Sequence, residues 1–170
     1  HCPFRIGGPA DLFVLPENEE QLCAAIRLAK EAGVRSYLLG NGSNILFEDA
    51  GYRGAVINVS AMKNGIGVTE NISFPGKDPA LTYDAVVVGA GQMLSSLCMA
   101  ALENSLTGLE FAYGIPGTVG GAVYMNAGAY GGEMKDVLAS VRYLTGEGEI
   151  VESPAEQLDL RYRHSIFEEN

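Results

Sequence analysis

The chain has 170 residues, of which 47% are apolar and 19% charged, with 11 Lys and Arg against 21 Asp and Glu. The apolar and charged shares are ordinary for a globular domain and exclude a disordered chain. The net charge of −10 argues against nucleic acid or an anionic membrane surface as a general partner. No apolar run reaches the about 18 residues that suggest a membrane span. The three cysteines form no Cys-x-x-Cys pair, so a reducing, cytoplasmic location is expected.

Residues 1–60 are predicted to form a small α/β lobe. Asn18 is the expected N-cap of a helix, Gln21 completes a capping box, and Gly33 ends the helix. Apolar and charged residues alternate between these signals at helical spacing, which predicts an amphipathic helix. Three strands are expected around it, over Ala10–Val14, Ser36–Leu39 and Ala55–Val59, the second of them buried.

Residues 61–170 are predicted to form a second, α+β lobe, in which residues 62–83 are an insertion. Within the insertion, Val68, Ile72 and Phe74 suggest a two-stranded excursion that leads into a polar loop over Pro75–Tyr83. The chain then re-enters a core. The elements expected there are a strand over Ala85–Val88, a helix with the apolar stripe Leu94, Leu97, Cys98, Ala101 and Leu102, and a strand over Asp136–Leu144. The stretch Asp159–Ser165 is too polar to be expected in a core.

Gly89-Ala90-Gly91 follows a Val-rich strand and precedes a helix, which is the setting of a dinucleotide-binding Rossmann turn. Leu94 stands where the third glycine of that pattern belongs, however. No second strand ends in an acidic residue about 20 positions later. A plain strand-to-helix turn is therefore the better interpretation.

Glycine is the unusual component, with 22 residues, whereas average usage is about 7%. Gly40-Asn41-Gly42-Ser43-Asn44 follows a strand, and its backbone N–H groups can form a concave anion site or simply a tight turn. Residues 114–132 hold seven glycines. Pro116 leaves the N–H groups after it free to face a ligand, although a glycine-rich packing crossover would use the same residues. Two such loops in one acidic chain favour a bound diphosphate cofactor.

Arg163, in Tyr162-Arg163-His164-Ser165, is either a solvated surface arginine or a guanidinium that binds a carboxylate and stabilises developing negative charge. Spacing does not decide between these interpretations. His1 and His164 lie far apart and lack companion ligands, so no metal site is predicted.

Several ordered sequence blocks cover nearly the whole chain, residues 62–83 excepted. They are Phe4-Arg5-Ile6-Gly7-Gly8-Pro9-Ala10-Asp11, Leu39-Gly40-Asn41-Gly42-Ser43-Asn44, Thr107-Gly108-Leu109-Glu110-Phe111, Gly114-Ile115-Pro116-Gly117-Thr118-Val119-Gly120-Gly121 with Met125-Asn126-Ala127-Gly128-Ala129-Tyr130-Gly131, and Tyr162-Arg163-His164-Ser165-Ile166-Phe167. In this order they resemble the UDP-N-acetylenolpyruvoylglucosamine reductases.

The resemblance implies an α+β fold, a two-lobed FAD-binding domain of the vanillyl-alcohol-oxidase (PCMH) type, with the flavin between the lobes. The positions that it assigns to cofactor binding are Leu39, Gly40, Asn41, Gly42, Ser43, Asn44 and Ile45, then Gly114, Ile115, Pro116, Gly117, Thr118, Gly120 and Gly121, and finally Asn126, Ala127 and Gly128. Arg163 matches the catalytic arginine of the family, and Tyr130 and Tyr162 are candidate substrate contacts.

The function that the resemblance implies is reduction of UDP-N-acetylglucosamine enolpyruvate to UDP-N-acetylmuramate, with NADPH as reductant, in bacterial peptidoglycan precursor synthesis and hence in cell wall biogenesis, cell shape and division. The chain starts without Met and stops at Asn170. The family's third domain, with its proton-donating Ser, a catalytic Glu and most substrate contacts, is therefore expected to be missing and the fragment inactive alone. Ser165 is not assigned the proton-donor role.

Two alternatives stay open, another FAD-dependent oxidoreductase on the same scaffold and a flavin-binding module without chemistry. The oligomeric state is not fixed by the sequence, with a monomer favoured.

Overall fold

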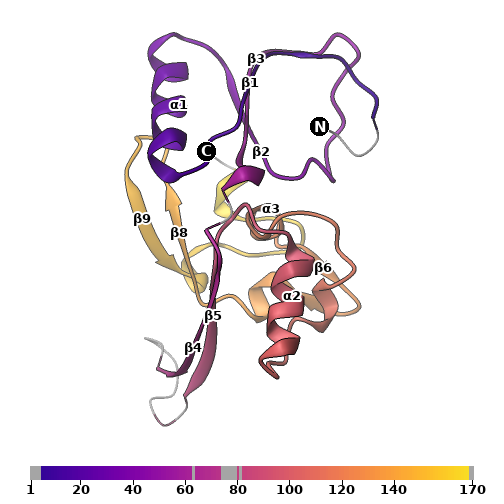
Figure 1. Ribbon diagram of the computed structural model, residues 1–170, viewed down its shortest axis with the longest axis vertical. Helices are drawn as coiled ribbons and strands as arrows, with labels where there is room; N and C mark the ends of the chain where they lie inside the picture. Colours follow the sequence, from indigo (N-terminus) through magenta and orange to yellow (C-terminus); the bar gives the residue numbers. More distant parts are fainter. Residues whose placement is uncertain (1–4, 63, 74–79, 81, 169–170) are drawn as a thin grey trace.

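The computed structural model describes residues 5–62, 64–73, 80 and 82–168. The first four residues, the predicted strand residue Phe74 and most of the predicted loop Pro75–Tyr83 lie outside these ranges. Within residues 10–58 the chain forms a parallel sheet of order β1-β3-β2, with a helix between the first two strands (Figure 1). The elements are β1 (Ala10–Val14), α1 (Glu19–Glu31), β2 (Ser36–Leu39) and β3 (Tyr52–Asn58).

Both ends of α1 follow from the residues that cap it. The Asn18 side chain accepts a hydrogen bond from the Gln21 N–H at 2.9 Å, as predicted. The Gln21 side chain, however, accepts from the Glu17 N–H and not from the N-cap residue, so the predicted capping box is shifted by one residue. Gly33 has a φ of +64°, and two crossing hydrogen bonds, from Gly33 to Lys30 and from Val34 to Ala29, close the helix in a Schellman motif.

The prediction that β2 is buried is wrong for most of the strand. Only Leu39 is buried, whereas Tyr37 and Leu38 are exposed. β2 lies at the edge of the sheet, and burial centres on the middle strand β3, where Val56 and Ile57 are enclosed. This strand begins three residues before the predicted start, and Val59 belongs to the 3₁₀ turn that follows it.

The insertion forms a hairpin whose second strand is the predicted core strand. β4 (Ile66–Ile72) pairs antiparallel with β5 (Tyr83–Val88), and the hairpin projects away from the rest of the chain (Figure 1). Val86 and Val88 pack against a second hydrophobic core, which lies outside the β1-β3-β2 sheet and is described below, whereas Val87 is exposed. The predicted two-stranded excursion and the predicted core strand are therefore parts of one hairpin.

The second core surrounds α2 (Leu94–Glu103) and α3 (Val119–Tyr124). Leu94, Leu97, Cys98 and Ala101 are buried as predicted, but Leu102 is 68% exposed and does not belong to the stripe. Short strands β6 (Gly128–Ala129) and β7 (Gly132–Glu133) pair beside this core. The predicted strand over Asp136–Leu144 is shorter than expected, because Met134–Asp136 form a 3₁₀ turn and β8 covers only Ser140–Leu144.

Beyond its own strand pairing with β9 (Ile150–Pro154), β8 is tied to the first helix. The Arg142 guanidinium binds both carboxylate oxygens of Glu19 at 2.6 and 2.9 Å, and the Lys30 ammonium donates to the Gly146 carbonyl at 3.1 Å. Elements of residues 1–60 and 61–170 are thus in direct contact. Division of the chain at residue 60 stays a prediction.

The polar stretch Asp159–Ser165 lies mostly outside the core, as predicted, with Ser165 as the buried exception. Ser165 is fully enclosed and donates a hydrogen bond to the Tyr124 carbonyl at the end of α3. The Ile166 N–H donates to the carbonyl of Leu158, which is also fully buried. A polar sequence is therefore held against the core by hydrogen bonds to its backbone and hydroxyl groups.

Within the described ranges, no helix has the length and apolarity needed to cross a bilayer. In the same ranges, no three His, Cys, Asp or Glu side chains are grouped so that they could hold a metal ion.

The left-handed conformation of Gly33 predicts that alanine destabilises the protein at this position but not at Gly67, although both glycines face open space. A Cβ added at Gly33 or at Gly67 would meet no atom within 4 Å, but only Gly33 has a positive φ. We expect Gly33→Ala to lower the free energy of unfolding by about 1–2 kcal/mol, and Gly67→Ala to leave it unchanged or to raise it by up to about 1 kcal/mol. Urea unfolding of both variants measures the difference, and equal effects would contradict the prediction.

Candidate functional site

The two glycine-rich loops, Gly40–Asn44 and Gly114–Gly121, meet where elements of residues 1–60 contact elements of residues 61–170. The Ser43 hydroxyl donates a hydrogen bond to the Pro116 carbonyl at 2.8 Å. A Cβ at Gly40 would lie 2.5 Å from the Thr118 Oγ1, and one at Gly117 would lie 3.2 Å from the Ser43 Oγ. Gly117 also has a φ of +145°, a conformation that favours glycine. The glycines therefore permit an approach that side chains would block.

Each loop is fixed from behind by a buried polar residue. Asn58, at the end of β3, donates its side-chain amide to the Gly40 carbonyl at 2.7 Å. Thr118, only 1% exposed, is the N-cap of α3, and its Oγ1 accepts from the Gly121 N–H at 3.2 Å. The Leu94 N–H, at the start of α2, donates to the Gly117 carbonyl at 3.0 Å. The loop positions are thus set by the ends of regular elements.

The N–H groups after Pro116 are not generally free, which corrects the expectation from the sequence. Val119 donates to Gln92, Gly120 to Ala90, and Gly121 to the Thr118 hydroxyl. Other N–H groups in the two loops make no hydrogen bond within the described part of the chain. Those without an acceptor among the described residues belong to Asn41, Gly42, Ser43, Asn44, Gly117 and Thr118.

The predicted strand-to-helix turn at Gly89–Leu94 is confirmed, because it joins β5 directly to α2. A Cβ at Gly91 would lie 2.2 Å from the Val59 carbonyl oxygen, so this glycine serves the packing of the turn against the chain after β3. The Ala90 and Gln92 carbonyls accept from the N-terminal turn of α3. The turn is therefore engaged in holding the second loop.

Arg163 lies at the tip of a tight turn and has a φ of +53°. Its guanidinium donates to the Gly128 carbonyl at 2.9 Å and lies 5.6 Å from the centre of the Tyr162 ring. Tyr130 is 96% and Tyr162 80% exposed, so both predicted substrate contacts present their rings outward. The structure brings Arg163 to Gly128, which is itself among the predicted cofactor positions.

Asn126 is the polar centre of this region, a role that the sequence did not reveal. It is 1% exposed and has a φ of +42°. Its amide nitrogen donates to the Glu133 carboxylate and to the Arg161 carbonyl, both at 2.8 Å, and its oxygen accepts from the Lys135 N–H at 2.9 Å. The side chain of this predicted cofactor residue is therefore engaged within the protein. No local pattern in the sequence marks Glu133 or Lys135 as its partners.

The sequence matches the family described as "FAD binding domain" over residues 10–153. The chain belongs to the FAD-binding domain family. The predicted α+β fold of the vanillyl-alcohol-oxidase type is confirmed by solved structures. A VAO-type flavoprotein from Myceliophthora thermophila C1 has a TM-score of 0.63 at 16% identity, with 86% of this chain and 27% of that one covered, and this likeness concerns the fold alone.

The resemblance to UDP-N-acetylenolpyruvoylglucosamine reductases is confirmed as well. The chain is 46% identical to the reductase of Clostridioides difficile (strain 630) over 170 residues, which are 100% of the chain and 52% of that protein. A crystal structure of the Thermus caldophilus enzyme has a TM-score of 0.65 at 33% identity, with 94% of this chain and 51% of that one covered. The chain thus spans about half the length of the curated relatives it matches.

The two-loop site of this FAD-binding domain has the features that a diphosphate requires. Unused N–H groups in the first loop offer hydrogen-bond donors without a basic side chain. The missing side chains of Gly40 and Gly117 serve the close approach of the two loops that carry these donors. Of the residues with these donors, Gly42, Gly117 and Thr118 are buried, and two cavities of about 410 and 330 Å³ lie elsewhere, beside Met99 on α2 and beside Phe47. The residues present therefore fit the cofactor's pyrophosphate, while each residue's assignment stays a prediction.

Glu133 predicts an acid sensitivity of the region around Asn126. Hydrogen bonds from Lys135 and Asn126, together with the charges of Lys135 and Arg163, hold the pKa of the Glu133 carboxyl below its usual range. Its stabilising contribution is therefore complete above the usual carboxyl pKa and is lost as the pH falls through the depressed one. We expect Glu133→Gln to lower the urea midpoint at pH 7 and to lose less stability on acidification than the parent. Parallel pH dependences of the two proteins between pH 7 and pH 3 would refute this.

Proposed function

We propose that this chain is the FAD-binding part of an NADPH-dependent, cytoplasmic UDP-N-acetylenolpyruvoylglucosamine reductase of peptidoglycan precursor synthesis. The observation that supports it most directly is the meeting of the Gly40–Asn44 and Gly114–Gly121 loops, with N–H donors left for a pyrophosphate. The 46% identity to the Clostridioides difficile reductase over the whole chain supports the choice of substrate, UDP-N-acetylglucosamine enolpyruvate.

In this proposal the chain's residues have distinct tasks. The two loops bind the cofactor's pyrophosphate, and Ser43 keeps them at a fixed separation through the Pro116 carbonyl. Arg163 binds the substrate carboxylate and stabilises the enolate-like charge that develops on it. When bound, the flavin would carry reducing equivalents from NADPH to the vinyl carbon of the substrate. Proton donation to the adjacent carbon and most substrate contacts are assigned to residues outside this chain, and Ser165 has its hydroxyl bonded to Tyr124.

Another FAD-dependent oxidoreductase on the same scaffold is the second candidate, favoured by the likeness in fold to VAO-type flavoproteins. A flavin-binding module without chemistry is the third, and it follows from the half-length match to the reductases. The exposed Arg163 beside Gly128 favours the first proposal over a module without chemistry, because a pyrophosphate site needs no guanidinium at that position.

The loop contact predicts that retention of FAD depends on the bare backbone at Gly40. We expect the 170-residue protein to show flavin absorption bands after incubation with FAD and desalting. Gly40→Ala forces a methyl group against Thr118, a type of overpacking that costs about 1–3 kcal/mol, and should weaken FAD binding by about tenfold or more.

The matched control is Gly146→Ala, where a Cβ meets no atom within 4 Å and φ is not positive. Circular dichroism shows whether each variant is folded. A folded, colourless parent protein would contradict a cofactor site complete within this chain. Equal FAD retention by the two variants would contradict the role given to the loop contact.

The role proposed for Arg163 predicts that its removal lowers catalysis and leaves cofactor binding unchanged. In the protein as its gene encodes it, we expect Arg163→Ala to lower kcat for the enolpyruvyl substrate by about 10²–10³-fold, as removal of one charge-stabilising donor does elsewhere. FAD absorption should be unchanged. Arg27→Ala on the exposed face of α1 is the charge-matched control. Unaltered NADPH oxidation by Arg163→Ala would favour a different substrate on the same scaffold.

A further inference from the structure

The turn that carries Arg163 is closed by its own backbone. The Arg161 N–H donates to the His164 carbonyl at 3.2 Å, and the His164 N–H donates to the Arg161 carbonyl at 3.1 Å. Only Tyr162 and Arg163 lie between them, and Arg163 has the left-handed φ of +53°. A two-residue turn with an exposed, non-glycine residue in this conformation needs contacts from outside the turn to hold one arrangement.

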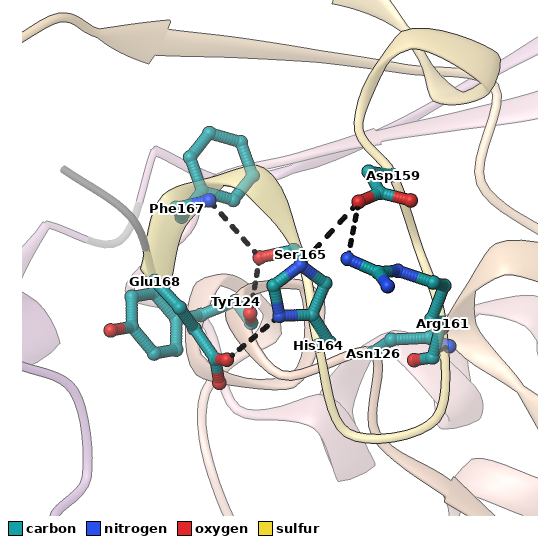
Figure 2. A network of polar contacts seen from close by, with 8 residues as sticks. All are labelled: Tyr124, Asn126, Asp159, Arg161, His164, Ser165, Phe167 and Glu168. Atoms are coloured by element: carbon teal, nitrogen blue, oxygen red, sulfur yellow. Dashed lines mark hydrogen bonds and ion pairs between the residues drawn. The ribbon is translucent and has the colours of Figure 1, made fainter.

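His164 supplies such contacts in two directions. Its Nδ1 lies 3.1 Å from the Glu168 Oε2, and its Nε2 lies 3.5 Å from the Asp159 Oδ2 (Figure 2). The same Asp159 oxygen accepts from the Arg161 guanidinium at 2.6 Å. The imidazole therefore lies between a carboxylate that precedes the turn and one that follows it.

The base of the turn is anchored separately. Asn126 donates to the Arg161 carbonyl, and Ser165 donates to the Tyr124 carbonyl (Figure 2). These two contacts connect the turn to the end of α3. The imidazole adds side-chain contacts at the residue directly after Arg163, beside the hydrogen bond that the His164 N–H makes to the Arg161 carbonyl.

We propose that His164 is a positioning residue for Arg163. With Nδ1 at hydrogen-bond distance from Glu168 and Nε2 facing Asp159, it fixes the backbone after Arg163 and so directs the guanidinium to the Gly128 carbonyl. The inference rests on the proposed function in one respect only, namely that Arg163 acts on the substrate. The placement of the Arg163 side chain can be tested without substrate.

The variants that test it remove the contacts one at a time. His164→Phe keeps a planar ring and loses both nitrogens, and His164→Gln keeps a polar side chain able to reach one carboxylate. Asp159→Asn neutralises one flanking carboxylate at a position whose φ of +44° asparagine tolerates. Glu152→Gln, a carboxyl paired with Ser140 on the β8–β9 hairpin, is the matched control for loss of charge.

The substrate-free measurement is the ¹H–¹⁵N signal of the Arg163 Nε–H, with hydrogen exchange of the His164 amide beside it. We expect His164→Phe to shift or broaden the arginine signal and to accelerate amide exchange at least tenfold. Asp159→Asn should have a smaller effect, and Glu152→Gln none. If the arginine signal is the same in folded His164→Phe, His164→Gln and the parent, the proposal is wrong.

A double-variant cycle separates positioning from general stability. In the gene-encoded protein, His164→Phe should lower kcat with the enolpyruvyl substrate by about 10–100-fold, the scale expected for misplacement by an ångström, with partial recovery in His164→Gln. In an Arg163→Ala background the same substitution should change kcat less than about twofold. An undiminished effect in that background would overturn the proposal. Absence of turnover in the parent would instead refute the proposed function, and the substrate-free measurement would still decide the role of His164.

Discussion

The arrangement of the whole chain depends on how closely its two glycine-rich loops approach each other. Gly40 ends the sheet side of the contact, and the buried Thr118 begins α3 on the other side. Because Thr118 is held by its hydrogen bond to Gly121 and cannot withdraw, the backbone at Gly40 must be bare. This contact holds the β1-β3-β2 sheet against the core around α2 and α3. The distant ion pair between Glu19 and Arg142 supports the same arrangement.

A second constraint is backbone conformation. Four non-glycine residues near or within the Arg163 turn have positive φ, namely Asn126, Tyr130, Asp159 and Arg163. Such conformations cost about 1–3 kcal/mol each and gather where function requires a particular geometry. The three hydrogen bonds of Asn126 and the ion pair of Asp159 offset that cost. The strain and its compensation lie in the same place, which is why the turn can present a guanidinium outward and stay ordered.

Local signals were sufficient for much of the fold. Asn18 and Gly33 bound α1 because capping is a property of a few neighbouring residues, and the apolar spacing of Leu94, Leu97 and Cys98 identifies the buried face of α2. The candidate loops were recognised because unusual glycine density has few other uses. Resemblance, not spacing, singled out Arg163, since nothing adjacent in the sequence distinguishes it from a solvated arginine.

What failed depended on partners far away in the chain. Apolar Leu38 looks buried in sequence but lies on an edge strand, and polar Ser165 is buried because it meets a carbonyl 41 residues earlier. Of the N–H groups expected to be free after Pro116, those of Val119 and Gly120 are bonded to the turn before α2. Each error has the same origin: burial and hydrogen-bond satisfaction are tertiary properties, whereas periodicity and capping are local.

The boundary of the family match lies before the turn that carries Arg163. The FAD-binding domain covers residues 10–153, whereas the turn with Arg163 follows it. The turn reaches the domain through Asn126 and through the carbonyls of Tyr124 and Gly128, which lie at the end of α3 and just after it. In the proposed function, this turn brings the substrate contact of Arg163 to the cofactor domain. The contacts that hold the turn would therefore contribute to catalysis along with the arginine itself.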